Sequence, residues 1–227
     1  MTMVGNFQSQ KQQLLRELMR SGVRDKRVLD AFEHVPREQF VDRMYMNQAY
    51  DNVALPIQME QTISQPLMVA VMTQALQLMG NERVLEVGTG SGYQTAILSQ
   101  LAHHVYSVER HRQLSWLAAQ RLYAMNVENV SLYVSDGSAG WPEQAPYDRI
   151  IVTAAASEIP EPLLAQLAPR GIMIIPVGEP RRQELLRVQN TFFGPRTTML
   201  GGCVFVPLVH DVELSKGDEM KGSREQS

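Results

Sequence analysis

Short apolar runs, separated by segments with helical or turn-forming patterns, fill the middle of the chain. The runs are rich in β-branched residues and span 84–87, 105–108, 130–134, 149–152 and 172–177. Strands that are apolar on both faces and alternate with helices are typical of a parallel sheet with helices on both sides. The pattern therefore predicts an α/β fold with a doubly wound, mostly parallel sheet.

The segments before the first run indicate a helical extension. Leu, Met, Val and Phe recur at helical spacing over 6–21 and 25–34, and Gly22 separates the two stretches. A third helix is expected over 67–79. The intervening segment 35–65 is irregular and moderately apolar, and segments of that kind often line functional sites.

The end of the chain shows a different pattern. Two short apolar runs, 184–190 and 203–209, flank the turn-rich segment 191–202 and predict an antiparallel hairpin that closes the sheet edge. The polar segment 213–227 is expected to be disordered. We therefore predict one domain: helices and a site-lining segment in 1–80, a ligand-binding core in 81–180 and closing strands in 181–212.

Composition narrows the class of protein. The 227 residues are 44% hydrophobic and 20% charged, which suits one buried core. A net charge of -3 argues against a nucleic-acid partner, and no apolar run is long enough for a membrane span. A single cysteine, Cys203, fits a reducing compartment. We expect a soluble, cytoplasmic protein that is a monomer or a weak homo-oligomer. No metal site is predicted, because the side chains of the adjacent residues His103 and His104 would point to opposite faces of a strand.

A glycine-rich turn follows the first predicted strand. The sequence VLEVGTGSGYQTAIL (84–98) places Gly88, Gly90 and Gly92 between a strand and a helix, where bare backbone can approach a ligand. The spacing differs from the dinucleotide motif GxGxxG. Glu86 beside the turn would repel a pyrophosphate and favour a cationic ligand, and S-adenosylmethionine meets that preference. A tight turn in another α/β protein is the alternative.

Acidic residues follow the next two predicted strands. Glu109 lies about 20 positions beyond the glycine turn, where a carboxylate often binds a ribose diol. Asp136 and Gly137 follow the third strand, where the carboxylate would accept from an adenine amino group. Thr153 ends the fourth strand at the edge where ligands of such sheets bind. The alternatives are a solvated strand end for Glu109, a plain turn for Asp136 and a strand-end cap for Thr153.

Several segments together resemble one enzyme family, from the N-terminal helices to position 209. The sequences LPIQMEQTISQP, VLEVGTGSGYQTAIL, VYSVER, YDRIIVTAA and FVPLV are similar to those of protein-L-isoaspartate O-methyltransferases, which are class I S-adenosylmethionine-dependent enzymes. The glycine turn is shared by many methyltransferases, whereas QTISQP, YDRIIVTAA and FVPLV are specific. The resemblance implies a Rossmann-like methyltransferase that repairs proteins. It would methylate the α-carboxyl of L-isoaspartyl residues, and the ester would then form a succinimide.

The resemblance also implies roles for single residues. A substrate carboxyl with a pKa of about 3.9 is already ionised, so positioning groups rather than a general base are expected. The family's serine corresponds to Ser64, beside the substrate carboxylate; without the resemblance, a turn or N-cap role would be preferred. Thr62, Ile63 and Val206 would line the peptide groove. For the cofactor, the implied contacts are Gly88, Gly90 and Gly92 with the methionine part, Glu109 with the ribose, and Asp136 and Gly137 with the adenine. Glu86 would organise the turn or meet the ammonium group.

Two positions depart from the family pattern PIGxGQTIS. Gln58 and Glu60 replace glycines just before Ser64, so the loop is bulkier and negatively charged. Ser135 replaces the first glycine of the usual GDG. The first change puts the peptide preference in doubt rather than the reaction.

Other functions fit the sequence less well. A nicotinamide-dependent dehydrogenase would show GxGxxG and a Tyr-x-x-x-Lys pair, and a base-modifying methyltransferase an Asp/Asn-Pro-Pro-aromatic segment where this chain reads VTAAAS. A methyltransferase for another acceptor, or a non-catalytic protein that binds an adenosine ligand, stays open. Arg181 and Arg182 are read as residues of a solvated loop.

Overall fold

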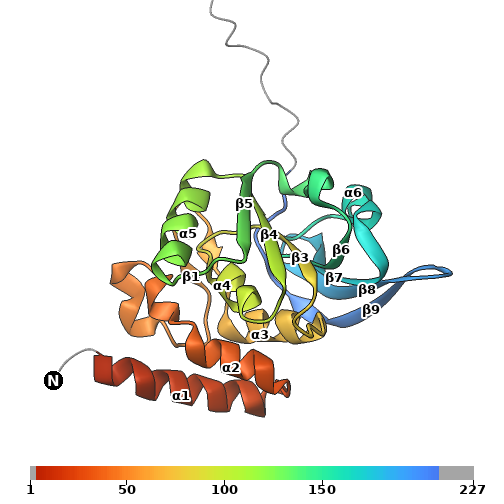
Figure 1. The fold of residues 1–227 in the computed structure, drawn as a ribbon. Helices are drawn as coiled ribbons and strands as arrows, with labels where there is room; N and C mark the ends of the chain where they lie inside the picture. The colour runs from red at the N-terminus through yellow and green to blue at the C-terminus, as the bar shows by residue number, and fades with distance from the viewer. Residues whose placement is uncertain (1–3, 210–227) are drawn as a thin grey trace, which may run out of the picture.

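The structure is a computed structural model, which describes residues 4–209, and a seven-stranded sheet forms its centre (Figure 1). The segment 213–227, expected to be disordered, lies outside the described residues. The strands follow the order β5-β4-β3-β6-β7-β8-β9. Their bounds are β3 Arg83–Val87, β4 His104–Glu109, β5 Val130–Val134, β6 Tyr147–Val152, β7 Leu167–Glu179, β8 Arg182–Thr191 and β9 Gly194–Cys203.

The five strands from β5 to β7 pair in parallel, and β8 and β9 continue the sheet in antiparallel fashion. This confirms the predicted fold class. The chain builds β3, β4 and β5 outward in one direction and then returns to place β6 on the other side of β3. Ligands of such sheets bind at the carboxyl ends of the strands where the order reverses. The edge of β3 and β6 is therefore the expected place for a site.

Alternating residues of the central strands enter two separate cores. Val84, Val105 and Ile151 belong to the larger cluster, which includes the N-terminal helices, whereas their neighbours Leu85 and Tyr106 belong to the smaller cluster on the other face. Because successive side chains of a strand point to opposite faces, both faces of the sheet are buried. The helices beside the sheet are α3 Pro66–Ala75, α4 Tyr93–Ser99, α5 Arg112–Ala124 and α6 Glu161–Ala165.

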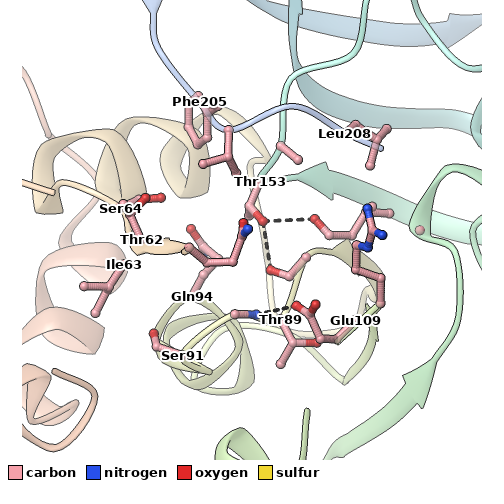
Figure 2. Close-up of a pocket in the computed structure, with 18 of the residues that line it drawn as sticks. Thr62, Ile63, Ser64, Thr89, Ser91, Gln94, Glu109, Thr153, Phe205 and Leu208 are labelled. Atoms are coloured by element: carbon pink, nitrogen blue, oxygen red, sulfur yellow. Dashed lines mark hydrogen bonds between the residues drawn. The ribbon is translucent and has the colours of Figure 1, made fainter. Parts of the chain in front are cut away.

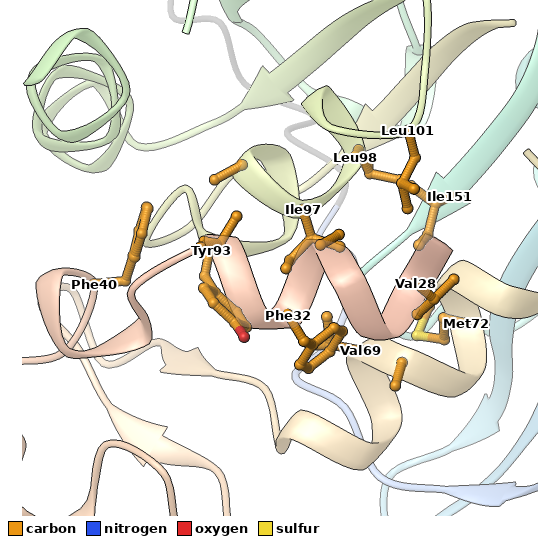
Figure 3. Packing of buried hydrophobic residues seen from close by; sticks show 14 of the residues in the cluster. Val28, Phe32, Phe40, Val69, Met72, Tyr93, Ile97, Leu98, Leu101 and Ile151 are labelled. Atoms are coloured by element: carbon orange, nitrogen blue, oxygen red, sulfur yellow. The ribbon is translucent and has the colours of Figure 1, made fainter. Parts of the chain in front are cut away.

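The N-terminal helices lie along one side of the sheet domain (Figure 1), and aromatic side chains join this region to α4 (Figure 3). The ring of Tyr93, at the start of α4, lies 6.0 Å from that of Phe32 in α2 and 5.5 Å from that of Phe40, both edge to face. These contacts attach the irregular segment to the turn that precedes α4. The remaining elements of this region are α1 Val4–Arg20, α2 Lys26–His34, η1 Arg37–Gln39, η2 Arg43–Gln48, β1 Leu55–Pro56 and β2 Thr62–Ile63; the short turns η3 Gly137–Ala139 and η4 Pro142–Gln144 precede β6.

The third helix is shorter than predicted. The apolar pattern indicated a helix over 67–79, but α3 ends at Ala75. Gln77 adopts the left-handed conformation with φ of 54°, which commonly terminates a helix. The apolar residues that follow it lead into β3 outside the helix.

The closing hairpin was predicted with the wrong strand bounds. β8 and β9 pair from Gln183 with Cys203 to Thr191 with Gly194, so the turn lies at Phe192 and Phe193. An edge strand can pair through backbone groups whatever its side chains, which explains why the polar segment 191–202 contributes most of β9. Residues 204–209, which we call the strap, leave the sheet and cross the end of β6. There, Ala155 N donates to Val206 O at 2.8 Å, and Leu208 N donates to Ala155 O at 2.7 Å.

Within the described part of the chain, no helix combines the length and the apolar character that crossing a membrane requires.

Candidate functional site

A pocket lies at the carboxyl ends of β3, β4 and β6, under the strap (Figure 2). Three regions distant in sequence meet there: the segment at β2, the glycine turn and the strap. Figure 2 shows Ser64 and Thr62 on one side and Glu109 on the other, with Thr153 between them. Most of the residues singled out from the sequence line it, namely Thr62, Ile63, Ser64, Gly88, Gly90, Glu109, Gly137, Thr153 and Val206, whereas Glu86, Gly92 and Asp136 do not.

The glycine turn adopts backbone angles that other residues rarely take. Gly88, Gly90 and Gly92 have φ of 97°, 52° and 86°. A Cβ on Gly88 would overlap Thr153 Oγ1, which itself lies within hydrogen-bond distance of Val87 O (3.0 Å) and Gly88 O (2.8 Å). Thr153 thus fixes the turn from the neighbouring strand, and glycine is required where the two meet.

Glu109 presents a carboxylate that the backbone already holds in place. Oε2 accepts from Gly90 N and Oε1 from His111 N, each at 2.9 Å, and the side chain is only 5% exposed. A carboxylate oxygen can accept more than one hydrogen bond, so both oxygens keep capacity for donors of a ligand. A fixed pair of acceptors facing the pocket suits a vicinal diol.

Glu86 lies behind the glycine turn and not in the pocket. Its Oε2 accepts from Thr95 Oγ1 and Ser107 Oγ, both at 2.6 Å, and Thr89 Oγ1 lies 2.6 Å from Ser107 Oγ. Complete burial raises the pKa of the Glu86 carboxyl to about 8; the two hydroxyl donors oppose this effect, and the charge of Glu109 adds to it. The placement favours organising the turn over meeting a ligand's ammonium group.

Of the neighbouring residues Asp136 and Gly137, only Gly137 lines the pocket. The Asp136 carboxylate caps η3, since its Oδ1 accepts from Ser138 N at 2.9 Å and from Ser138 Oγ at 2.8 Å. Gly137 lines the pocket, and a Cβ there would come within 2.5 Å of Val87 Cγ1. The glycine therefore lets the chain after β5 approach β3 closely.

Ser64 follows β2, which pairs with β1 through Leu55 with Ile63 and Pro56 with Thr62. The turn between these strands places Met59 and Glu60 at φ of 58° and 57°, although neither is glycine. Within residues 4–209, Ser64 Oγ has no hydrogen-bond partner. The hydroxyl that faces the pocket is therefore free to donate to a ligand.

A buried arginine supports the Ser64 segment, and sequence reasoning missed it. The guanidinium of Arg37 is 0% exposed and lies 4.8 Å from the centre of the Tyr93 ring. Its Nε donates to Ala49 O at 2.8 Å and its Nη2 to Ser64 O at 3.0 Å. Burial lowers the pKa of this guanidinium, and no carboxylate among the described residues forms an ion pair with it. No local pattern distinguishes Arg37 from a surface arginine.

A second cavity of about 570 Å³ adjoins the pocket. The two share Thr62, Ser64, Thr153 and two strap residues as common walls. Arg181 and Arg182, read from the sequence as residues of a solvated loop, are exposed but line this cavity. The pocket also includes Thr89, Ser91, Gln94, Phe205 and Leu208, whose only signal in the sequence was proximity to the glycine turn or to FVPLV.

The residues that line the pocket fit an adenosyl ligand. The backbone of Gly88, Gly90 and Gly137 in the pocket wall and the held carboxylate of Glu109 can supply the contacts that a nucleoside with a free diol requires. Residues 4–209 contain no group of three or more His, Cys, Asp or Glu side chains placed to hold a metal ion.

Comparisons with known proteins agree with this geometry. The model of the protein-L-isoaspartate(D-aspartate) O-methyltransferase family matches residues 9–213. A protein-L-isoaspartate O-methyltransferase of Parvibaculum lavamentivorans is 49% identical over 214 residues, covering 93% of this chain and 96% of the relative. One from Vibrio campbellii is 52% identical over 196 residues, covering 86% and 94%.

Two solved structures resemble the fold over the same region. A structure named protein-L-isoaspartate O-methyltransferase superposes with a TM-score of 0.79 at 30% identity, over 87% of this chain and 65% of that one. A Plasmodium falciparum protein assigned to the same family, in complex with S-adenosyl-L-homocysteine, gives a TM-score of 0.75 at 25% identity, over 87% and 97%.

Proposed function

Because the chain belongs to the protein-L-isoaspartate(D-aspartate) O-methyltransferase family, we propose that it transfers a methyl group from S-adenosylmethionine to the α-carboxyl of L-isoaspartyl residues in damaged proteins. The methyl ester then cyclises to a succinimide with loss of methanol, and hydrolysis of that ring returns part of the product to L-aspartyl. One observation carries the proposal: the free hydroxyl of Ser64 and the held carboxylate of Glu109 line a single pocket, in a chain that matches the family over 9–213.

The proposed reaction does not require a general base from the protein. A carboxyl with a pKa of roughly 3 to 4 is ionised at neutral pH, so its oxygen is already nucleophilic. The bound cofactor supplies an electrophilic methyl group on a sulfonium. Correct placement of the two reactants can lower the barrier by roughly 7 to 11 kcal/mol. In the proposed role, Ser64 Oγ donates to one carboxylate oxygen and leaves the other directed at the methyl group. Arg37 holds the Ser64 carbonyl and hence the position of that hydroxyl.

Cofactor contacts are assigned to the opposite side of the pocket. Glu109 accepts from the ribose hydroxyls, the backbone of the glycine turn meets the methionine part, and Gly137 borders the adenine. Asp136, expected from the sequence to contact the adenine, does not line the pocket and instead caps η3 next to Gly137. Support comes from the two backbone hydrogen bonds that hold the Glu109 carboxylate and from the presence of Gly88, Gly90 and Gly137 in the pocket lining. Glu86 and Thr153 shape the turn from behind and from the side.

The peptide groove belongs to the same proposal. Thr62 and Ile63 border one side of the groove and Val206 of the strap the other, and the second cavity continues from them. In this division, 1–80 contributes the substrate side, 81–180 the cofactor side and 181–212 the closing wall. The proposed enzyme is a cytoplasmic monomer or weak homo-oligomer that acts on protein and not on nucleic acid. The single cysteine supports a reducing compartment, and the net charge of -3 argues against a nucleic-acid substrate.

Transfer of labelled methyl groups to a peptide with one L-isoaspartyl residue, beside its L-aspartyl twin, tests the function. We expect methylation of the first peptide alone. Ser64→Ala should lower kcat for that peptide by about 10-fold or more, because one positioning hydrogen bond is lost. Ser99→Ala is the matched control, since Ser99 Oγ donates to Ala96 O inside α4, outside the pocket. Cofactor binding without transfer to either peptide would contradict the proposed acceptor.

A further inference from the structure

The second cavity is lined by two arginines that have no role in the proposed methyl transfer. It opens from the walls formed by Thr62, Ser64 and Thr153, and Arg181 and Arg182 line it as well. The described residues that line it include no Asp or Glu. A substrate held at Ser64 would therefore extend into a concave space whose charged side chains are cationic.

The backbone places an arginine where glycine is favoured. Glu179 pairs with Arg182 across β7 and β8, so Pro180 and Arg181 form a two-residue turn. Proline at the first of these positions and a positive φ at the second characterise a turn that usually takes glycine second. Arg181 occupies that second position with φ of 72°.

This turn is tied firmly to the strap over the pocket. Gln183, only 5% exposed, donates from Nε2 to Phe205 O at 3.0 Å, and its Oε1 accepts from Phe205 N at 2.6 Å. A Cβ on Gly178 would come within 2.5 Å of Arg182 O, so β7 and β8 approach closely at the turn. The backbone of the arginine turn therefore has a fixed position relative to the strap.

Both guanidinium groups are available to a ligand. Each side chain is exposed, and within residues 4–209 neither forms an ion pair with a carboxylate. The chain as a whole carries a net charge of -3, so it does not attract anionic peptides in general. Attraction of an anion at this point must come from the local pair of cations.

We propose that Arg181 and Arg182 form a subsite for a carboxylate of the substrate outside the isoaspartyl residue. The carboxylate comes from an Asp or Glu side chain near the isoaspartyl residue or from a peptide's C-terminus. Acidic isoaspartyl segments are then the preferred substrate class. This inference rests on the proposed function, because it takes the isoaspartyl residue to lie at Ser64.

A peptide series tests the subsite directly. Each peptide of the series contains one isoaspartyl residue and carries Glu or Gln at one of the three positions before it or the three positions after it. Each peptide is made with a free and with an amidated C-terminus. The wild-type protein should show a KM about 3- to 10-fold lower for at least one Glu or free-terminus peptide than for its neutral twin, at equal kcat. The preference should shrink with added salt, because exposed charges are screened. The position of the effect identifies the source of the carboxylate.

The double variant Arg181→Gln/Arg182→Gln removes the charges. It should abolish the difference between acidic and neutral peptides and leave the KM for neutral peptides and for the cofactor unchanged. Arg170→Gln/Arg196→Gln is the matched control: it changes net charge equally, and Arg170 is also exposed with a positive φ of 65°, yet neither residue lines the second cavity. Equal thermal unfolding temperatures would establish that all variants are folded.

The outcomes separate this inference from the proposed function. Methylation of all peptides with no acidic preference, or a preference that survives in the Arg181→Gln/Arg182→Gln variant, overturns the subsite alone. If no peptide is methylated, the proposed function fails. Fluorescence anisotropy of labelled peptides, with S-adenosyl-L-homocysteine present, then decides the subsite: acid-dependent binding that the double variant loses supports it, and binding without that dependence, or none, overturns it.

Discussion

Replacing Glu86 with glutamine should make the protein less sensitive to alkaline pH. The Glu86 carboxyl is 0% exposed, and burial is the main reason that its pKa rises from 4.5 to about 8. A folded-state pKa above the unfolded value means that folding favours the protonated form. The stabilisation is therefore complete below pH 4.5 and is lost as pH rises from about 4.5 to about 8. Glutamine cannot ionise and avoids this loss.

The magnitude follows from the two pKa values. A pKa difference of one corresponds to about 1.4 kcal/mol, so the rise from 4.5 to about 8 implies a loss of roughly 5 kcal/mol in the free energy of unfolding. Between pH 5.5 and pH 8.5 the wild-type protein should lose roughly 3 kcal/mol more than Glu86→Gln. The glutamine amide also places an NH₂ where one Glu86 oxygen has no partner among the described residues, and that penalty is independent of pH. The change of the difference with pH is therefore the quantity to measure.

Urea unfolding at pH 5.5, 7.0 and 8.5 supplies the measurement. Wild type and Glu86→Gln are compared with Glu128→Gln, which changes an exposed carboxylate after α5 and should track the wild type at every pH. A difference between wild type and Glu86→Gln that stays constant within about 0.5 kcal/mol across this range would refute the reasoning. It would mean that Glu86 is ionised in the folded protein and that the hydroxyls of Thr95 and Ser107 stabilise the charge more than burial destabilises it.

Two further substitutions probe the two sides of the pocket. Gly88→Ala should weaken binding of S-adenosyl-L-homocysteine at least 10-fold by calorimetry, because the new Cβ meets Thr153 Oγ1 at a φ of 97°. Gly22→Ala, at a φ of 100° with open space around it, controls for backbone strain alone, and equal affinity in both variants would contradict the steric argument. Arg37→Met should lower the free energy of unfolding by roughly 3 kcal/mol, since the carbonyls of Ala49 and Ser64 lose a charged donor. It should also lower kcat for the isoaspartyl peptide, as Ser64→Ala does, without changing cofactor affinity, and an unchanged kcat in the folded variant would remove Arg37 from the positioning of Ser64.

The sequence by itself determined the features that depend on local pattern. Apolar runs such as 172–177 identified strands of the sheet, because a strand buried on both faces is apolar along its length. Gly88 marked the turn that lines the pocket, since only glycine combines a φ of 97° with the close approach of Thr153. Glu109 could be placed at the same edge because one helix between two parallel strands fixes the distance along the chain. Ser64 needed the family resemblance, because a serine before proline has no local signature of its own.

Only the tertiary structure decided how residues far apart in sequence meet. Burial turned Glu86 from a candidate ligand contact into a support behind the turn, and it made Arg37 a donor to the Ser64 carbonyl. The segment 204–209 became a strap, not a strand, because the edge position was filled by backbone pairing of β9. From the sequence, Arg182 was read as a residue of a solvated loop, whereas in the structure it lines a cavity beside the pocket. Such outcomes depend on long-range packing and on the desolvation of polar groups, which the order of residues along the chain does not reveal.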